Sequence, residues 1–123
     1  MRGKYYMSEA ERDVMEVLWT FPEGVNQSVL LKAVNAAGKD WKRQTLNTFI
    51  TKLMEKGLVN RENRYVTAAM DKQAYGNWQI EEVVKEVYDG KISAFMLAFA
   101  KDQKLTKEDK EELEKLLKTY EME

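Results

Sequence analysis

The sequence predicts a mainly α-helical fold with one small β-hairpin, made of two parts that meet near residue 70. Three observations predict this fold. Apolar residues recur at spacings of three and four through most of the chain, which is the period of an amphipathic helix. The period shifts towards two only over residues 58–67, as in paired strands. Glycines follow several of the periodic segments, where helices commonly end.

Residues 8–20 form the first predicted helix. Ser8 and Glu11 stand three positions apart, in the capping-box arrangement in which each side chain satisfies a free amide at the start of a helix. Pro22 and Gly24 end the segment. The stripe that is expected to face the core consists of Ala10, Val14, Val17, Leu18 and Phe21.

Two further helices follow, with a short turn between them. The second covers residues 26–37, with Asn26 as its N-cap, and Gly38 ends it. The third covers residues 42–56. The inward residues are expected to be Val29, Leu30, Ala33 and Val34 in the second helix and Leu46, Phe49, Ile50, Leu53 and Met54 in the third.

A hairpin is predicted after the third helix. Residues 58–61 and 64–67 are its strands, and Glu62-Asn63 joins them, because two polar residues between strands suit a tight turn. The order helix, helix, turn, helix, hairpin is that of a winged helix-turn-helix, in which the hairpin is called the wing. We therefore predict a DNA-binding domain over residues 1–70.

The C-terminal part, residues 71–123, is predicted to be a helical dimerisation region. Its apolar stripes lie at residues 80–88, 92–100 and 113–120. Such short helices bury little surface alone, so a second copy of the chain is the expected partner. The residues predicted to dimerise are Val83, Val84, Val87, Tyr88, Ile92, Phe95, Met96, Phe99, Leu113, Leu116, Leu117 and Tyr120.

The composition disfavours several classes of function. The 123 residues include no cysteine and no histidine, so the sequence predicts no disulfide, no metal site and no cofactor, and it lacks the commonest general base. The acidic residues at 108, 111, 112 and 114 have the spacing of a solvated helix face, so an enzyme is not expected. No apolar run reaches the roughly 18 residues of a membrane span, and a cytoplasmic location is expected.

The charge is divided unevenly along the chain. Residues 1–66 hold 11 Lys/Arg against 8 Asp/Glu, a net charge of +3, whereas residues 67–123 hold 9 against 13, a net charge of −4. Within residues 42–64, six basic residues accompany two acidic ones. This distribution favours an anionic partner for the N-terminal part.

The polar side of the third predicted helix carries the side chains that recognise bases. Arginine pairs with guanine, asparagine and glutamine pair with adenine, and threonine contacts either a polar base edge or a thymine methyl. Two arginines are expected to flank the tip of the wing and to contact the DNA backbone or the minor groove. The residues predicted to contact DNA are Lys42, Arg43, Gln44, Thr45, Asn47, Thr48, Thr51, Lys52, Arg61 and Arg64.

Other interpretations of these residues stay open. The polar helix side is also compatible with an ordinary solvated surface, and winged helices also serve as protein-interaction modules without specific DNA binding. A steep loss of DNA affinity with salt distinguishes DNA binding from that alternative. Trp19, Trp41 and Trp78 are interpreted as core residues, because tryptophans beside apolar stripes more often pack than stack on bases.

The blocks Trp41-Lys42-Arg43-Gln44-Thr45-Leu46-Asn47-Thr48 and Lys52-Leu53-Met54-Glu55-Lys56-Gly57-Leu58-Val59 resemble the penicillinase-repressor family, which includes the methicillin-resistance repressors. The start of the first helix, from Ser8, and the segment Tyr88-Asp89-Gly90 are similar too. The resemblance implies a homodimeric repressor that binds dyad-symmetric operators of antibiotic-resistance or cell-wall-stress genes. It also implies inactivation by a regulatory protease that cuts the dimerisation region.

The chain departs from the pattern of that family in several places. The wing is shorter and lacks the usual Gly-Arg tip, and Ala69 stands where a proline often ends the wing. The expected cleavage region is residues 83–87, where Lys85 replaces the usual asparagine. The copper-responsive branch of the family needs C-terminal cysteines, so copper sensing is not predicted for this chain.

Overall fold

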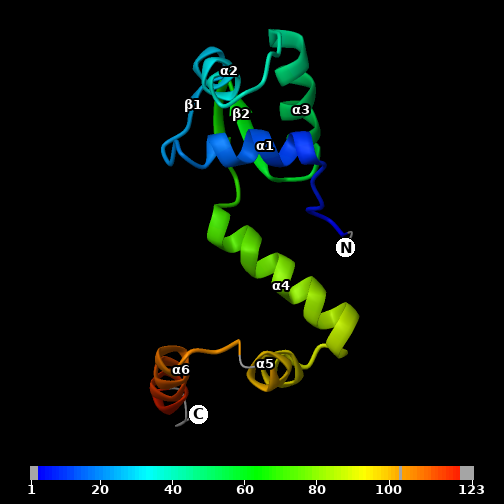
Figure 1. Ribbon diagram of the computed structural model, residues 1–123. Helices are drawn as coiled ribbons and strands as arrows, with labels where there is room; N and C mark the ends of the chain where they lie inside the picture. The colour runs from blue at the N-terminus through cyan, green and yellow to red at the C-terminus, as the bar shows by residue number, and fades with distance from the viewer. Residues whose placement is uncertain (1–2, 103, 120–123) are drawn as a thin grey trace. The chain divides into compact units, whose positions relative to one another are not determined.

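The computed structural model describes residues 3–102 and 104–119. The chain divides into two compact units, Met1–Ile80 and Glu81–Glu123. In the described part of the first unit, three helices and a three-stranded sheet precede the start of a fourth helix (Figure 1). The mainly α fold with a small β-hairpin that the sequence predicts is confirmed.

Helix α1 (Glu9–Leu18) begins at the predicted capping box. The Glu11 backbone N–H donates to Ser8 Oγ at 3.2 Å, and the Ser8 backbone N–H donates to Glu11 Oε1 at 2.7 Å. These two bonds satisfy amides that have no partner inside the helix, which fixes its start. The helix ends at Leu18, slightly before the predicted end near Thr20.

Helix α2 (Gln27–Ala36) has the predicted cap and stop. The Asn26 side-chain oxygen accepts from the Ser28 N–H at 2.9 Å. At the other end Gly38 adopts a φ of +118°, which lets the Lys39 N–H donate to the Val34 carbonyl at 3.4 Å and close a Schellman motif. Val29 was predicted to face inward, and this prediction is wrong.

The buried side of α2 is narrower than the sequence suggests. Gln27, Leu30 and Val34 are buried, whereas Val29 lies one position off their line and is 45% exposed. A residue one position away on a helix is turned by about 100°, so a narrow contact leaves it in solvent. Gln27 is buried although it is polar, and the sequence did not predict its burial.

Helix α3 (Arg43–Glu55) packs on the same core and lies above α1 in the view of Figure 1. Leu46, Ile50 and Leu53 are fully buried, as their spacing predicts. Phe49 and Met54 pack against the core from its edge. This apolar side orients the helix, so the opposite side carries its polar residues to the surface.

The sheet has three short antiparallel strands in the order β1-β3-β2. They are β1 (Val25–Asn26), β2 (Val59–Glu62) and β3 (Tyr65–Ala68). Val25 lies opposite Val66, which in turn lies opposite Arg61 on β2. Strand β1 was not predicted, because two residues are too few to show an alternating pattern.

The predicted hairpin joint at Glu62-Asn63 is wrong by one residue. The turn is Asn63-Arg64, whose φ angles are 51° and 68°. Two successive positive φ angles are those of a type I′ turn, whose twist matches the strands of a hairpin, and asparagine adopts them readily. The Arg64 carbonyl accepts from the Gln27 N–H at 2.7 Å, which ties the turn to the start of α2.

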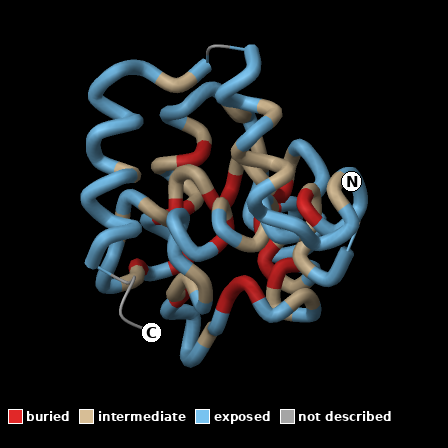
Figure 2. The backbone as a smooth tube through the Cα atoms, turned by 90° about the horizontal axis from the view of Figure 1, so that it is seen from below, coloured by how far each residue is buried: buried red, intermediate tan, exposed pale blue. Residues whose placement is uncertain are grey.

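The core of the first unit is built from residues of its helices and of its sheet. Figure 2 marks the buried parts of the chain in red. The three tryptophans pack against it, so their structural interpretation is confirmed. The Trp19 indole N–H donates to the Met70 carbonyl at 2.9 Å, and Trp41 stacks on Phe49 with ring centroids 5.0 Å apart. The fully buried residues include Val14, Met15, Leu18, Leu30, Leu46, Ile50, Leu53, Leu58 and Val66.

Helix α4 (Lys72–Tyr88) begins before the apolar stripe from which it was predicted. The Asp71 side chain caps it by accepting from the Ala74 N–H at 2.8 Å. Tyr75 and Trp78 pack against the core of the first unit, so the boundary between the compact units falls after Ile80. The functional division into residues 1–70 and 71–123 remains a prediction.

The second unit contains the rest of α4, helix α5 (Ile92–Lys101) and helix α6 (Lys107–Thr119). Gly90 ends α4 with a φ of +79°, and its N–H donates to the Val84 carbonyl at 2.9 Å. The described residues of α5 and α6 include no buried side chain. No helix in the described ranges is long and apolar enough to cross a bilayer.

Candidate nucleic-acid interface

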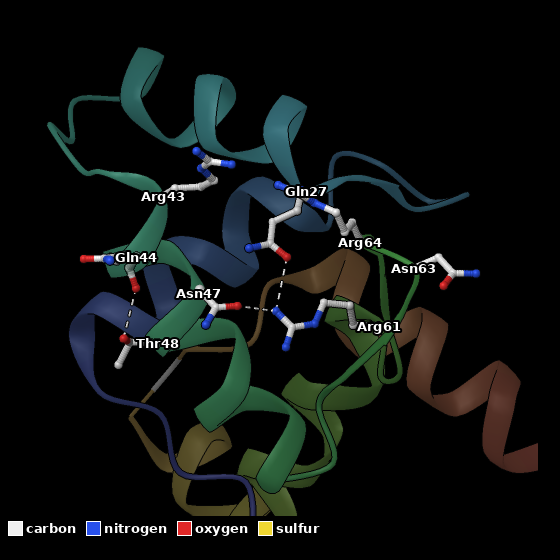
Figure 3. Close-up of a pocket in the computed structure, with 8 residues that line it drawn as sticks. All are labelled: Gln27, Arg43, Gln44, Asn47, Thr48, Arg61, Asn63 and Arg64. Carbon is white, nitrogen blue, oxygen red and sulfur yellow. Dashed lines mark hydrogen bonds between the residues drawn. The ribbon is translucent and has the colours of Figure 1, made fainter.

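A polar hollow of about 800 Å³ opens between α3 and the wing (Figure 3). We call it the basic hollow, because three arginines line it and no aspartate or glutamate does so among the described residues. It combines one side of α3, the first residue of α2, Arg61 of β2 and the two residues of the hairpin turn. Its lining residues are Gln27, Arg43, Gln44, Asn47, Thr48, Arg61, Asn63 and Arg64.

Six of the ten residues predicted to contact DNA line the basic hollow, and four do not. The four are Lys42, Thr45, Thr51 and Lys52, which lie elsewhere on α3 or at its N-cap. All of these except Thr51 are exposed. The structure therefore brings together Arg43, Gln44, Asn47, Thr48, Arg61 and Arg64.

Two hydroxyls on the polar side of α3 bond to the helix itself. Thr48 Oγ1 donates to the Gln44 carbonyl at 3.0 Å, and Thr51 Oγ1 donates to the Asn47 carbonyl at 2.9 Å. These bonds leave each hydroxyl oxygen able to accept a further hydrogen bond. Arg43 and Gln44, in the first turn of the same helix, also line the hollow (Figure 3).

The sequence predicted that Arg61 flanks the tip of the wing. In the structure Arg61 lies within strand β2, and Glu62 separates it from the Asn63-Arg64 turn. It shares a face of the sheet with Val66, because the two residues are directly opposite across the β2–β3 pair. Its side chain therefore points to the helices. Nη1 donates to Asn47 Oδ1 at 2.6 Å and to Gln27 Oε1 at 3.1 Å (Figure 3).

Arg64 occupies the turn itself. It is exposed, and its backbone carbonyl rather than its side chain connects the turn to α2. Arg64 lines the basic hollow together with the polar side of α3 (Figure 3). A cation at this place is suited to a phosphate beside a groove.

Two lining residues were missed by the sequence analysis. Asn63 could have been identified as the first turn residue if the hairpin joint had been placed one residue later. Gln27 gave no signal, because its 5% exposure results from contacts with residues far away in the sequence. Its role becomes visible only in the folded chain.

A partly buried ion pair holds the C-terminal end of α3. Lys56 Nζ donates to Glu11 Oε1 and to the Tyr6 carbonyl, each at 2.7 Å. Glu11 is 2% exposed. Burial raises the pKa of Glu11, but hydrogen bonds from Lys56 and Ser8 outweigh burial and hold the pKa below its usual value. The pair ties the start of α1 to the end of α3.

The model of the penicillinase repressor family matches residues 7–119. The chain belongs to the penicillinase repressor family. The penicillinase repressor of Bacillus licheniformis is 25% identical over 118 residues, which cover 93% of this chain and 91% of that protein. The methicillin resistance regulatory protein MecI of Staphylococcus aureus strain N315 is 24% identical over 124 residues, which cover 92% and 94%. Both relatives are named for regulation rather than for an enzymatic reaction.

This member of the penicillinase repressor family has an apolar hollow of about 460 Å³ in its second unit. Helices α5 and α6 and the segment between them line it with Phe95, Met96, Phe99, Leu105, Asp109, Glu112, Leu113 and Leu116. Phe95 contacts Tyr88 edge-on with centroids 5.8 Å apart and lies 4.9 Å from Phe99. Five of the residues predicted to dimerise, Phe95, Met96, Phe99, Leu113 and Leu116, thus share one concave surface.

The other residues predicted to dimerise are distributed differently. Val84 is buried, and Val83 and Tyr88 are half-buried. Val87, Ile92 and Leu117 are 64%, 56% and 66% exposed, so each presents apolar surface to solvent. Tyr120 lies outside the residues that the structure describes. In the described ranges no group of three or more carboxylates is placed to hold a metal ion.

Proposed function

We propose that this chain is a homodimeric, sequence-specific DNA-binding repressor. The observation that carries the proposal is the basic hollow beside the polar side of α3, with three arginines and no lining carboxylate among the described residues. An α-helix with its side chains is about 10–12 Å across, which fits a major groove about 12 Å wide. Phosphates on either side of such a groove are attracted by the arginines.

The proposal gives base recognition to the N-terminal half of α3, with Arg43, Gln44, Asn47 and Thr48. Phosphate contacts fall to Lys42, Thr45, Thr51 and Lys52 on α3 and to Arg64 in the wing. The first turn of α3 contains no acidic residue and its N-cap Lys42 makes no capping bond, so its free amides are open to a phosphate.

The second unit is proposed to pair two copies of the chain. Its exposed apolar residues face solvent in the single chain. Their burial against a second copy contributes roughly 25 cal/mol of association free energy per Å² of apolar surface. A dimer carries two α3 helices related by a two-fold axis. The proposed operator is therefore dyad-symmetric, with half-sites about one helical turn, or a multiple of it, apart.

The proposed targets are genes for antibiotic resistance or cell-wall stress. This part rests on the names of the relatives, a penicillinase repressor and a methicillin resistance regulatory protein. A protease is the proposed inducing partner, because the resemblance to the penicillinase-repressor family implies one. Repression then follows from occupancy of the operator, and the protein needs to perform no chemistry.

The test is selection of bound sequences from a random duplex pool with the full chain, followed by affinity measurements at several salt concentrations. We expect a dyad-symmetric consensus and a log–log salt slope of about −0.9 for each phosphate contacted. Equal affinity for the selected sequence and for random DNA would reject a sequence-specific repressor. A shallow salt slope with weak binding would instead favour a protein-interaction module.

A further inference from the structure

The contact between Arg61 and Asn47 has a consequence for base recognition. Asn47 Oδ1 receives a hydrogen bond of 2.6 Å from Arg61 Nη1, so the amide oxygen is turned towards the wing (Figure 3). A guanidinium carries donors only, so the atom of Asn47 that faces it must be the oxygen. The orientation of the amide is therefore determined by its partner, and the amide nitrogen is left for other contacts.

Arg61 is itself held in place. The same Nη1 donates to Gln27 Oε1 at 3.1 Å, and Gln27 is 5% exposed at the start of α2. The sheet directs the stem of Arg61 to this side, since Arg61 lies opposite the buried Val66. A hydrogen bond from a charged donor is also roughly twice as strong as one between neutral groups. Both features favour persistence of the contact when DNA is bound.

The fixed amide is mismatched to adenine. An asparagine recognises adenine when its oxygen accepts from the N6 amino group while its nitrogen donates to N7. In this chain Asn47 Oδ1 accepts from Arg61 and is turned away from the base. The amide nitrogen, which is a donor, is then the group that faces the base. Guanine offers two adjacent acceptors, N7 and O6, to such a donor, whereas adenine places its own donor beside N7.

We propose that Arg61 is a positioning residue that orients the Asn47 amide, so that α3 selects guanine rather than adenine at the base pair facing Asn47. The proposal rests on the proposed DNA-binding function and replaces the expectation that Asn47 pairs with adenine. Arg61 then acts on specificity without contacting a base. Arg64, three positions away, supplies charge to the same hollow but has no part in this orientation.

The experiment uses the full chain and four duplexes that differ at one base pair of the selected operator. The Asn47→Ala variant first identifies that pair, as the position at which base preference is lost. We expect the wild type to bind the duplex with G·C there at least about fivefold more tightly than the one with A·T. Arg61→Met frees the amide oxygen and is expected to lower this ratio at least about fivefold.

Two further variants separate orientation from charge and from folding. Arg64→Met also removes a positive charge from the basic hollow, so it is expected to weaken all four duplexes equally and leave the ratio unchanged. Gln27→Met removes the second acceptor that holds Arg61 and is expected to lower the ratio less than Arg61→Met. It keeps the proposal testable if Arg61→Met does not fold, which a thermal melt monitors.

The possible outcomes distinguish the two proposals. A wild type that prefers A·T at this pair, or a ratio that Arg61→Met and Gln27→Met leave unchanged, would overturn the role of Arg61 and leave the repressor proposal intact. Identical changes in Arg61→Met and Arg64→Met would also overturn it. A wild type with no base preference at any position would overturn both proposals.

Discussion

Two arginines of the wing differ in role because of the direction in which the backbone points each side chain. Arg61 lies on a strand, opposite Val66, and its side chain turns in to Gln27 and Asn47. Arg64 lies in the turn and stays exposed. The sequence places both near a wing, but distinguishing them requires the strand register. With the joint placed one residue too early, Arg64 counts as a strand residue opposite Arg61, whereas in the structure it belongs to the turn.

Glu11 provides a test at the residue scale. We expect Glu11→Gln to lower the free energy of unfolding by about 1–3 kcal/mol at pH 7, because Lys56 then loses the carboxylate that accepts its hydrogen bond. Urea denaturation followed by circular dichroism measures this loss. Glu9→Gln, an exposed change in the same helical turn, is the control and is expected to cost about 0.5 kcal/mol or less.

The same pair predicts a dependence of stability on pH. The pKa of Glu11 is lower in the folded chain than its usual value of 4.5, so the pair stabilises fully above that value and loses its contribution as the pH falls through the folded pKa. The wild type is therefore expected to lose more stability between pH 7 and pH 3 than Glu11→Gln does. Parallel pH profiles for the two proteins would show that the ion pair is not involved.

At the scale of elements, local signals predicted several of the helix starts and ends. The capping box at Ser8, the Asn26 cap and the Gly38 stop were predicted because each involves residues within a few positions of one another. Strand β1 and the buried state of Gln27 were not, because both depend on pairing with β2 or β3 far along the chain. Helix α4 was predicted too short, since its first turns carry aromatic rather than aliphatic core residues.

Gly24 tests how closely the β1 segment approaches β3. A Cβ at this position would lie 2.9 Å from the Val66 carbonyl oxygen, and the backbone φ is +88°. We expect Gly24→Ala to cost about 2–4 kcal/mol from combined strain and overlap. Gly38→Ala also has a positive φ but meets no atom within 4 Å, so it should cost only about 1 kcal/mol. Thermal unfolding compares them, and similar losses would contradict the close approach.

At the scale of the whole molecule, the two compact units carry different chemistry. The first buries a continuous core and presents the basic hollow, whereas the second leaves apolar side chains in solvent. From charge and apolar stripes the sequence predicted a division at residues 70–71, which is ten residues before the boundary of the compact units and stays a functional prediction. It could not show that Val84 is buried while Val87 on the same helix is 64% exposed, because that depends on what packs on each side.

The dimer proposal predicts the effect of charge on the second unit. We expect Leu117→Glu combined with Val87→Glu to convert a dimer at micromolar concentration into a monomer, because the two side chains are 66% and 64% exposed in the single chain and their replacement leaves its fold intact. Sedimentation equilibrium measures the change. Lys115→Glu, an exposed charge reversal on α6, is the control. A monomeric wild type at this concentration would refute the proposal.

The central claim is that the polar side of α3 recognises bases while its apolar side anchors the helix in the core. The most direct test measures the affinity of Arg43→Ala for the selected operator and for a scrambled duplex of the same length. We expect a loss of about 1–3 kcal/mol on the operator and little on the scrambled duplex, whereas Lys52→Ala, a proposed phosphate contact, should weaken both alike. An equal loss for Arg43→Ala on both duplexes would contradict the claim.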